Sequence, residues 1–157
     1  MPLPSLLDPP LRLIMNGLHL ALRATWFVRR PRTMGAHALA LTPSGKLILV
    51  KLRYAVGWRI PGGGRNAGED AKIAMLRELR EEIGLTSHGE VQWACDLEHE
   101  IDFKRDLSSL FIVRDVRYQP PRWSWEIEDW LECPIEQLPP DLSPRTARWI
   151  QTLLPNL

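Results

Sequence analysis

The sequence predicts a single α+β domain in which a mixed β-sheet lies between helices. Three observations lead to this expectation. Short apolar runs of strand character are interspersed with two amphipathic helical stretches. The connections are turns rather than the regular helical crossovers of a doubly wound parallel sheet. Finally, 157 residues with 45% hydrophobic side chains are enough to bury one core without disulfides or a structural metal.

The expected strands are apolar runs bounded by glycine, proline and other turn residues. They cover residues 35–41, 46–52, 58–60, 90–97, 107–116 and 126–131. Thr42-Pro43-Ser44-Gly45 separates the first two runs, so we expect these to form a hairpin. The third run stops at Pro61, and the run Gly62-Gly63-Gly64 that follows is expected to be irregular, because so many glycines indicate positive φ or a close backbone approach.

Two helices are expected within this strand pattern. Residues 69–83 carry an apolar stripe of Leu76, Leu79 and Ile83, and Gly84 stands where a left-handed C-cap glycine belongs. Near the end of the chain, Ser143 followed by Pro144 predicts the start of a closing helix that runs to residue 154.

Residues 1–33 are predicted to be an amphipathic helical extension ahead of the main domain, which we place at 34–157. Apolar residues recur at helical spacing within 11–28, and polar residues interrupt the run. It is short for a bilayer span, and its basic residues follow it, unlike those of a signal peptide. One interpretation is a helix that packs on the domain or on a second subunit of a homodimer. The other is weak contact of residues 11–32 with an anionic membrane surface.

Composition limits the partners and the compartment. The net charge of +1 argues against long nucleic acid as the preferred partner, although a capped RNA end stays among the candidate substrates. Cys95 and Cys133 have no partner at metal-ligand spacing. They are interpreted as small buried side chains in a reducing compartment rather than a disulfide, which predicts a cytoplasmic location.

Three glutamates on the first predicted helix are the strongest chemical signal. Glu78, Glu81 and Glu82 stand at i, i+3 and i+4, so they share one face with Cβ atoms about 5–6 Å apart. A solvated acidic face is one explanation. A divalent-cation site is the other, because like charges this close resist ionisation without a cation, and Mg²⁺ prefers oxygen ligands.

The surrounding residues decide between these explanations. Gly63, five residues, Glu69, seven residues, and then the stretch from Arg77-Glu78 to Glu81-Glu82 and Gly84-Leu85 match every fixed position of the Nudix box. The sequence therefore resembles the Nudix hydrolase family over roughly residues 34–155. That resemblance implies a Nudix-type α/β/α sandwich, with the box on a loop–helix–loop.

The resemblance also implies an activity and a role for each box residue. Members hydrolyse a phosphoanhydride bond in a nucleoside diphosphate linked to another moiety (NDP-X), with Mg²⁺, for which Mn²⁺ can substitute. The positions of Glu78, Glu81, Glu82 and Gly63 are metal-binding in the family. Glu81, Glu82 and Arg77 would be catalytic, with Glu69 in support. The alternative is a catalytically inactive, nucleotide-binding regulatory domain, for which an intact box is atypical.

Residues outside the box supply further candidates. A second base could be Glu98, Glu100 or Glu126, with Asp102 and Glu128 nearby, although each could equally be a solvated carboxylate. Arg53, Trp58 and Arg59 precede the box and are candidate substrate-binding residues, as is Tyr54, or they are solvated strand ends. Trp123, Trp125 and Trp130 either pack the core and its rim or stack on a nucleobase.

Overall fold

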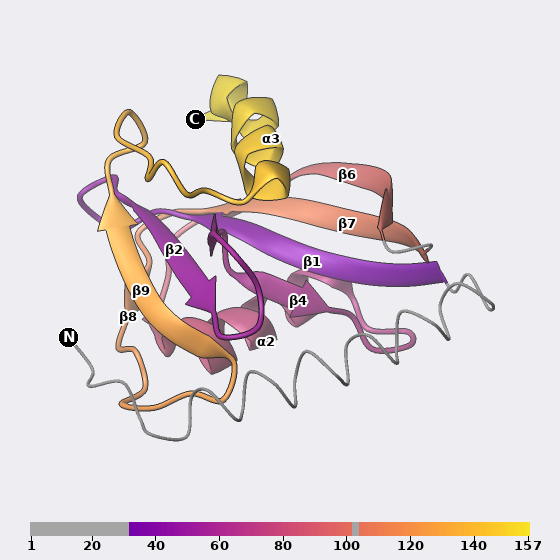
Figure 1. The fold of residues 1–157 in the computed structure, drawn as a ribbon, viewed down its shortest axis with the longest axis horizontal. Helices are drawn as coiled ribbons and strands as arrows, with labels where there is room; N and C mark the ends of the chain where they lie inside the picture. The colour runs from indigo at the N-terminus through magenta and orange to yellow at the C-terminus, as the bar shows by residue number, and fades with distance from the viewer. Residues whose placement is uncertain (1–31, 102–103) are drawn as a thin grey trace.

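The computed structural model describes residues 32–101 and 104–157, which form nine strands and two α-helices in the described part of the chain (Figure 1). The strands are β1 (Arg32–Ala40), β2 (Leu47–Leu52), β3 (Trp58–Arg59), β4 (Gly62–Gly64), β5 (Leu85–Ser87), β6 (Val91–Ile101), β7 (Lys104–Val113), β8 (Arg117–Tyr118) and β9 (Ile127–Cys133). The helices are α2 (Ala71–Ile83) and α3 (Pro144–Leu153), and a short 3₁₀ helix, η1 (Leu154–Asn156), follows α3.

The strands form a mixed arrangement, as the sequence predicts. The larger sheet has the order β4-β1-β7-β6, in which β1 and β7 are parallel and the other pairs are antiparallel. A second, antiparallel sheet has the order β3-β2-β9, and β5 pairs with β8. The mixed sheet follows from the long chain segment between β1 and β7, because parallel neighbours need a long connection.

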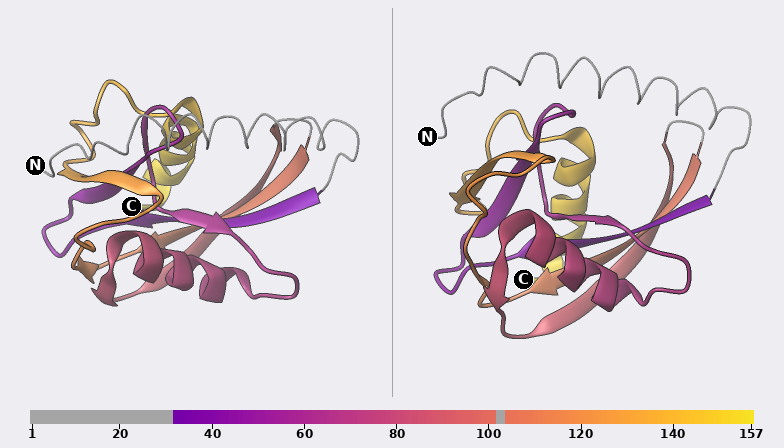
Figure 2. Two further views of the ribbon diagram at one scale, coloured as in Figure 1. Left: turned by 60° about the horizontal axis from the view of Figure 1, so that its bottom comes forward. Right: turned by 90° about the horizontal axis from the view of Figure 1, so that it is seen from below.

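The two helices cover opposite sides of the larger sheet (Figure 2). Alternate residues of β1 show why, since successive side chains of a strand point to opposite faces. Ala36, Ala38 and Ala40 pack in one core cluster with the apolar residues of α2. Leu39 and Leu41 pack in the other cluster with Trp149, Ile150 and Leu153 of α3. This confirms the predicted α/β/α sandwich.

Two details of the predicted strand pattern were wrong. The first two strands turn at residues 42–46, but only the bridge between Leu41 and Leu47 joins them, because β1 pairs along its length with β7 while β2 pairs with β9. The run Gly62-Gly63-Gly64 is not irregular, although Gly62 does have the expected positive φ, at 138°, and closely approaches Ala36 and His37. It is strand β4, antiparallel to β1, and the absence of side chains allows this close pairing with Gly35, Ala36 and His37.

Both predicted helices are confirmed with small shifts of their ends. The predicted extension at residues 1–33 lies almost entirely outside the described residues, so the helix at 11–28, its membrane contact and the domain boundary stay predictions. Within residues 32–101 and 104–157, no helix has the length and apolar character needed to cross a bilayer.

His37 of β1 gives the fold a predicted pH dependence. Its ring is 4.7 Å from that of Trp149, and burial, reinforced by the positive charge of Arg145, lowers the pKa of His37 from 6.5 to about 3. The folded protein therefore keeps His37 neutral at pH values where the unfolded chain protonates it. Stability from this group is complete above pH 6.5 and is lost as the pH falls toward 3, by at most about 1.4 kcal/mol per pH unit.

Denaturant unfolding between pH 4 and pH 7 measures this effect. The free energy of unfolding should fall less steeply with decreasing pH in His37→Asn than in the wild type. His88→Asn, at an exposed histidine, is the matched control and should keep the wild-type slope. Equal slopes for wild type and His37→Asn would contradict the prediction.

Candidate active site

Helix α2 and the loop before it are fixed by local caps at both ends. The Asp70 carboxylate accepts hydrogen bonds from the backbone N–H groups of Lys72 and Ile73, at 2.9 and 3.1 Å, and so begins the helix. Gly84 ends it in the left-handed conformation, at φ 69°. The glutamates on this helix are therefore held at a fixed rotation relative to β4.

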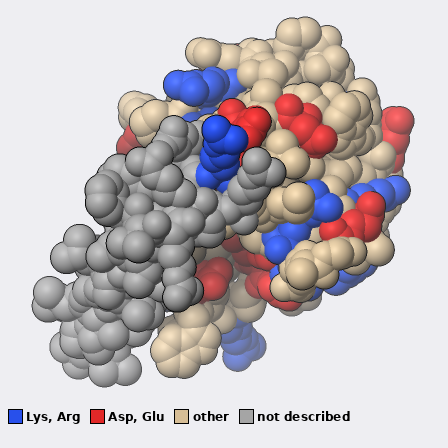
Figure 3. All heavy atoms as spheres, turned by 90° about the vertical axis from the view of Figure 1, so that its right-hand side faces the viewer, with Lys and Arg blue, Asp and Glu red and all other residues tan. Residues whose placement is uncertain are grey.

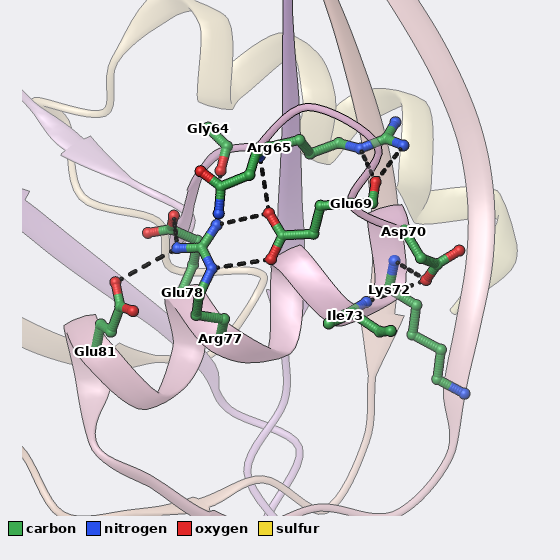
Figure 4. A network of polar contacts seen from close by, with 10 residues as sticks. Gly64, Arg65, Glu69, Asp70, Lys72, Ile73, Arg77, Glu78 and Glu81 are labelled. Carbon is green, nitrogen blue, oxygen red and sulfur yellow. Dashed lines mark hydrogen bonds and ion pairs between the residues drawn. The ribbon is translucent and has the colours of Figure 1, made fainter.

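Arg77 is the centre of the polar network beside the glycine run (Figure 4). Its Nε and Nη2 donate to the two carboxylate oxygens of Glu69, at 3.0 and 3.1 Å. Nη2 also donates to the carbonyl of Gly64 at 2.9 Å, and Nη1 donates to Glu78 at 2.6 Å and more weakly to Glu81 at 3.5 Å. The paired hydrogen bond to Glu69 is the geometry at which arginine is strongest.

This network sets the charges of its members. The hydrogen bonds from Arg77 hold the pKa of Glu69 below its usual range, and the hydrogen bonds to Glu69 and Glu78 raise the pKa of Arg77. The backbone N–H of Asn66 also donates to Glu69 at 2.8 Å. Glu69 is therefore charged and links the loop to the middle of α2 through Arg77, and its supporting role in the site stays a prediction.

Glu82 is the most deeply placed of the three helix glutamates. It is 6% exposed, and one carboxylate oxygen accepts a hydrogen bond from the Gly62 N–H at 2.8 Å. Burial raises the pKa of Glu82 to about 8, and the charges of Glu78, Glu126 and Glu81 act in the same direction. Burial likewise raises the pKa of Glu78, against the lowering effect of Arg77. Burial therefore disfavours the charged forms of Glu82 and Glu78 in the metal-free fold.

The three glutamates open into one cavity of about 600 Å³. We call the part lined by Glu78, Glu81, Glu82 and the three glycines of β4 the floor, and the part lined by Tyr54, Pro121 and residues 123–127 the facing wall. The wall residues the sequence had singled out are Tyr54, Trp123, Trp125 and Glu126. Sequence reasoning missed Ser124 and Gly62, although the position of Gly62 inside the glycine run was a signal for the latter.

The facing wall is itself anchored. Arg53, on the turn after β2, donates from Nε to the Ser124 carbonyl at 3.0 Å. The Ser124 hydroxyl accepts from the backbone N–H groups of Glu126 and Ile127, at 3.2 and 3.0 Å. Trp123 and Trp125 stack edge to face with centroids 4.4 Å apart, yet they stay 50% and 69% exposed. Trp130, on β9, has a different place. Its indole Nε1 donates a hydrogen bond to the backbone carbonyl of Glu82 at 2.9 Å and so supports α2.

The remaining predicted residues lie outside this cavity. Trp58 pairs with Lys51 across β3 and β2, and Arg59 lines a smaller cavity next to α3. Arg53 reaches the wall only through the Ser124 carbonyl. Glu98 is exposed on β6. The backbone of Glu100 pairs with that of Arg105. The side chain of Glu100 and the whole of Asp102 lie outside the part of the chain that the structure describes.

The oxygen donors around the cavity fit a divalent cation. Three glutamates and Glu126 line one space. The pKa of Glu82 is raised first by burial and then by the charges of Glu78, Glu126 and Glu81, and a cation in that space would offset both effects. Among the described residues, no three His, Cys, Asp or Glu side chains meet at ligand distance, because Glu78 and Glu81 turn to Arg77 and Glu82 turns to Gly62. Glu81, with a 60% exposed side chain, has room to reorient.

Gly63 and Gly64 provide a matched pair of variants for this site. A Cβ on Gly63 would lie 2.6 Å from the carboxylate carbon of Glu78, whereas a Cβ on Gly64 would have nothing within 4 Å. We expect Gly63→Ala to displace Glu78 and to lower kcat/KM by about tenfold or more, as other losses of ligand positioning do. Gly64→Ala should stay near wild type. Equal kcat/KM for the two variants, measured at fixed Mg²⁺, would contradict the placement.

The surface in Figure 3 bears on the class of ligand. On the face drawn there, acidic and basic side chains of the described residues are interspersed, and neither sign forms a broad patch. A protein that binds a nucleic-acid duplex uses a continuous basic surface. This face therefore offers no support for such a partner.

Comparisons with known proteins agree with the fold and the box. The family model of the NUDIX domain matches residues 31–153. A candidate 8-oxo-dGTP diphosphatase of Bacillus subtilis (strain 168) is 40% identical over 52 residues, which is 33% of this chain and 35% of that protein. The chain thus spans about a third of that relative's length.

Two solved structures share the fold. A MutT NUDIX hydrolase from Burkholderia pseudomallei superposes with a TM-score of 0.67, at 22% identity, over 78% of this chain and 98% of that one. A bifunctional NMN adenylyltransferase/ADP ribose pyrophosphatase from Francisella tularensis, solved with AMP and a manganese ion, gives a TM-score of 0.65 at 14% identity, over 92% of this chain and 48% of that one. With its box placed on a loop–helix–loop of this fold, the chain belongs to the NUDIX domain family.

Proposed function

We propose that this protein is a pyrophosphohydrolase that uses Mg²⁺ or Mn²⁺ to cleave the phosphoanhydride bond of a small NDP-X compound. The observation that carries the proposal is the shared cavity. Glu78, Glu81 and Glu82 come together there with the glycines of β4, and the facing wall presents two exposed tryptophans. An anionic floor for cations and an aromatic wall for a base are the two parts that a nucleotide hydrolase needs.

The floor residues would hold the cations. Glu78, Glu81 and Glu82, with a carbonyl of the glycine run such as that of Gly63, form an all-oxygen donor set, which is the set that Mg²⁺ prefers. When bound, the cations would neutralise charge on the diphosphate and lower the pKa of a bound water. Arg77 acts through the glutamates, because its hydrogen bonds fix Glu78 and tie it to Glu69.

The proton of the attacking water needs an acceptor in the same cavity. We assign this role to Glu82, whose carboxylate the Gly62 N–H orients. Glu126 is the second candidate, because it lines the cavity from the facing wall and acts electrostatically on Glu82. Among Glu98, Glu100 and Glu126, only Glu126 has a side chain that is described and that lines this cavity.

The wall residues would bind the nucleoside. Trp123 and Trp125 are exposed on the facing wall, which hydrogen bonds to Ser124 anchor. A flat ring can therefore lie against them without displacing core residues. The relatives named above act, by their names, on 8-oxo-dGTP and ADP ribose, which are both small nucleotide derivatives. That shared feature supports a small NDP-X substrate over long RNA.

A panel of NDP-X compounds and nucleoside triphosphates tests the proposal. It should include nucleotide sugars, dinucleotides and a capped dinucleotide, incubated with Mg²⁺ or Mn²⁺. The products are separated chromatographically. We expect at least one compound to yield a nucleoside monophosphate together with the complementary phosphate, only when the cation is present. Nucleotide binding without cleavage of any compound would favour the inactive regulatory domain and would contradict an enzyme.

A further inference from the structure

A second, small cavity lies between the sheet and α3, next to the larger one. We call it the basic pocket and define it by His37, Arg59, Arg145 and Trp149, which line it together with residues of β2 and α2. Leu52, Gly62 and Glu82 line both cavities, so the basic pocket lies next to the floor of the larger cavity. Neither the box nor the metal site uses the four defining residues.

The basic pocket is rich in hydrogen-bond donors that are not satisfied. The Arg59 Nε and the Trp149 Nε1 are both buried without a hydrogen-bond partner, and Trp149 is only 1% exposed. Neither nitrogen can accept a hydrogen bond in place of donating one. A buried polar group without a partner costs roughly 1–3 kcal/mol, so an acceptor in the pocket would recover that loss.

Two arginines, Arg59 and Arg145, line the pocket against one carboxyl group, that of Glu82, so cationic groups are in excess. Arg145 and Arg59 carry like charge, and burial, followed by the effect of Arg59, lowers the pKa of Arg145. The Arg145 Nη1 is 3.9 Å from an Asp106 oxygen, too far for a hydrogen bond, and the Asp106 carboxylate already accepts from Thr33 and Ser108.

The position of Arg145 on its helix is a second, independent sign. It is the second residue of α3, where the helix dipole disfavours a positive charge. Its guanidinium is held there over the Trp149 ring, at 4.7 Å from the ring centroid, and beside the pocket. An anion in the pocket would neutralise a cation that the helix alone does not stabilise.

The size of the pocket limits the anion. Its volume of about 40 Å³ corresponds to about three water-sized spheres, at roughly 10–15 Å³ each. A carboxylate has three heavy atoms, whereas a phosphate has five. We propose that the basic pocket binds a carboxylate group between Arg59 and Arg145, with the Trp149 N–H as a further donor. The carboxylate belongs either to the X group of the substrate, which rests on the proposed function, or to a free small acid.

Sodium formate is the probe for this proposal, titrated into the full-length protein without divalent cation or nucleotide. The readout is the indole N–H signal of Trp149 in ¹⁵N-correlated NMR spectra, assigned by its loss in Trp149→Phe. We expect a saturable downfield shift with formate and none with sodium chloride at equal ionic strength. Absence of a saturable shift in the wild type overturns the proposal, and saturation by inorganic phosphate but not formate overturns the choice of carboxylate.

Substitutions of Arg59 on β3 and of Arg145 on α3 test where formate binds. Arg59→Met and Arg145→Met should weaken formate binding by at least about tenfold, the loss expected for one charged hydrogen bond. Arg148→Met, at an exposed arginine of the same helix, is the matched control and should bind as wild type. Equal weakening in all three variants, or in none, overturns the assignment.

Kinetics with an NDP-X substrate then identify the source of the carboxylate. If X supplies it, formate competes with that substrate and Arg59→Met raises KM, whereas a free acid alters kcat and leaves KM unchanged. Either result supports the pocket, and no effect of saturating formate on kcat or KM overturns its link to the active site. Failure of hydrolysis itself would leave the formate titration intact, so the two proposals fail separately.

Discussion

Glu82→Gln is expected to fold normally and to lose roughly 10²–10³-fold in kcat, the range seen when one electrostatic stabiliser of a transition state is removed. The amide can still accept the hydrogen bond from the Gly62 N–H, which the wild-type carboxylate accepts at 2.8 Å. What it cannot do is bind a cation as an anion or take a proton from water. Activity and thermal unfolding should therefore separate in this variant.

The expected change in Tm of Glu82→Gln without metal has a definite direction. Burial raises the pKa of Glu82 to about 8, which means that the metal-free fold disfavours its charged form. Replacing it with a neutral amide should leave the metal-free Tm unchanged or raise it. Glu136→Gln, at an exposed carboxylate outside the cavity, serves as the control and should keep full activity. Activity within twofold of wild type in Glu82→Gln would remove this residue from the mechanism.

Arg77→Lys should lower activity by about 10–100-fold, as does the loss of groups that orient metal ligands. A lysine keeps the charge but lacks the planar fork that donates to both oxygens of Glu69 while also reaching Glu78. Because Arg77 acts through the glutamates, the variant should need more Mg²⁺ for half-maximal rate, and excess Mg²⁺ should recover part of kcat.

Arg80→Lys is the control for this variant, because Arg80 is exposed on the same helix. It should keep the wild-type Mg²⁺ dependence. A purely structural role for Arg77 would lower the Tm and leave the Mg²⁺ dependence of the remaining activity unchanged, and that outcome would contradict the positioning role.

The box helix could be predicted from sequence because its signals are local. The glutamate spacing, the stripe ending at Ile83 and the cap at Gly84 depend only on residues within a few turns, and α2 begins and ends within two residues of the expected bounds. The same holds for α3, which the Ser143-Pro144 cap starts. The spacing of the glutamates alone was therefore enough to place them on one face of the helix.

The partners of those elements depend on distant residues. The parallel pairing of β1 with β7 and the strand β4 follow from close approaches across the sheet, so a hairpin and an irregular glycine run were expected instead. Glu126 lines the larger cavity from the facing wall, whereas Arg59, six residues after Arg53, lines the smaller cavity next to α3. Contacts between residues so far apart in the chain cannot be predicted from the spacing of residues in the sequence.

Binding of Mn²⁺ to the full-length protein, followed by electron paramagnetic resonance, tests the central claim most directly. Free Mn²⁺ gives the signal that binding removes, so the assay needs no substrate. We predict saturable uptake by the wild type, strengthened by a nucleoside diphosphate, and at least about tenfold weaker uptake by the double variant Glu81→Gln/Glu82→Gln. Uptake that is equal in the two proteins, or undetectable in the wild type even with nucleotide, would contradict a divalent site on α2.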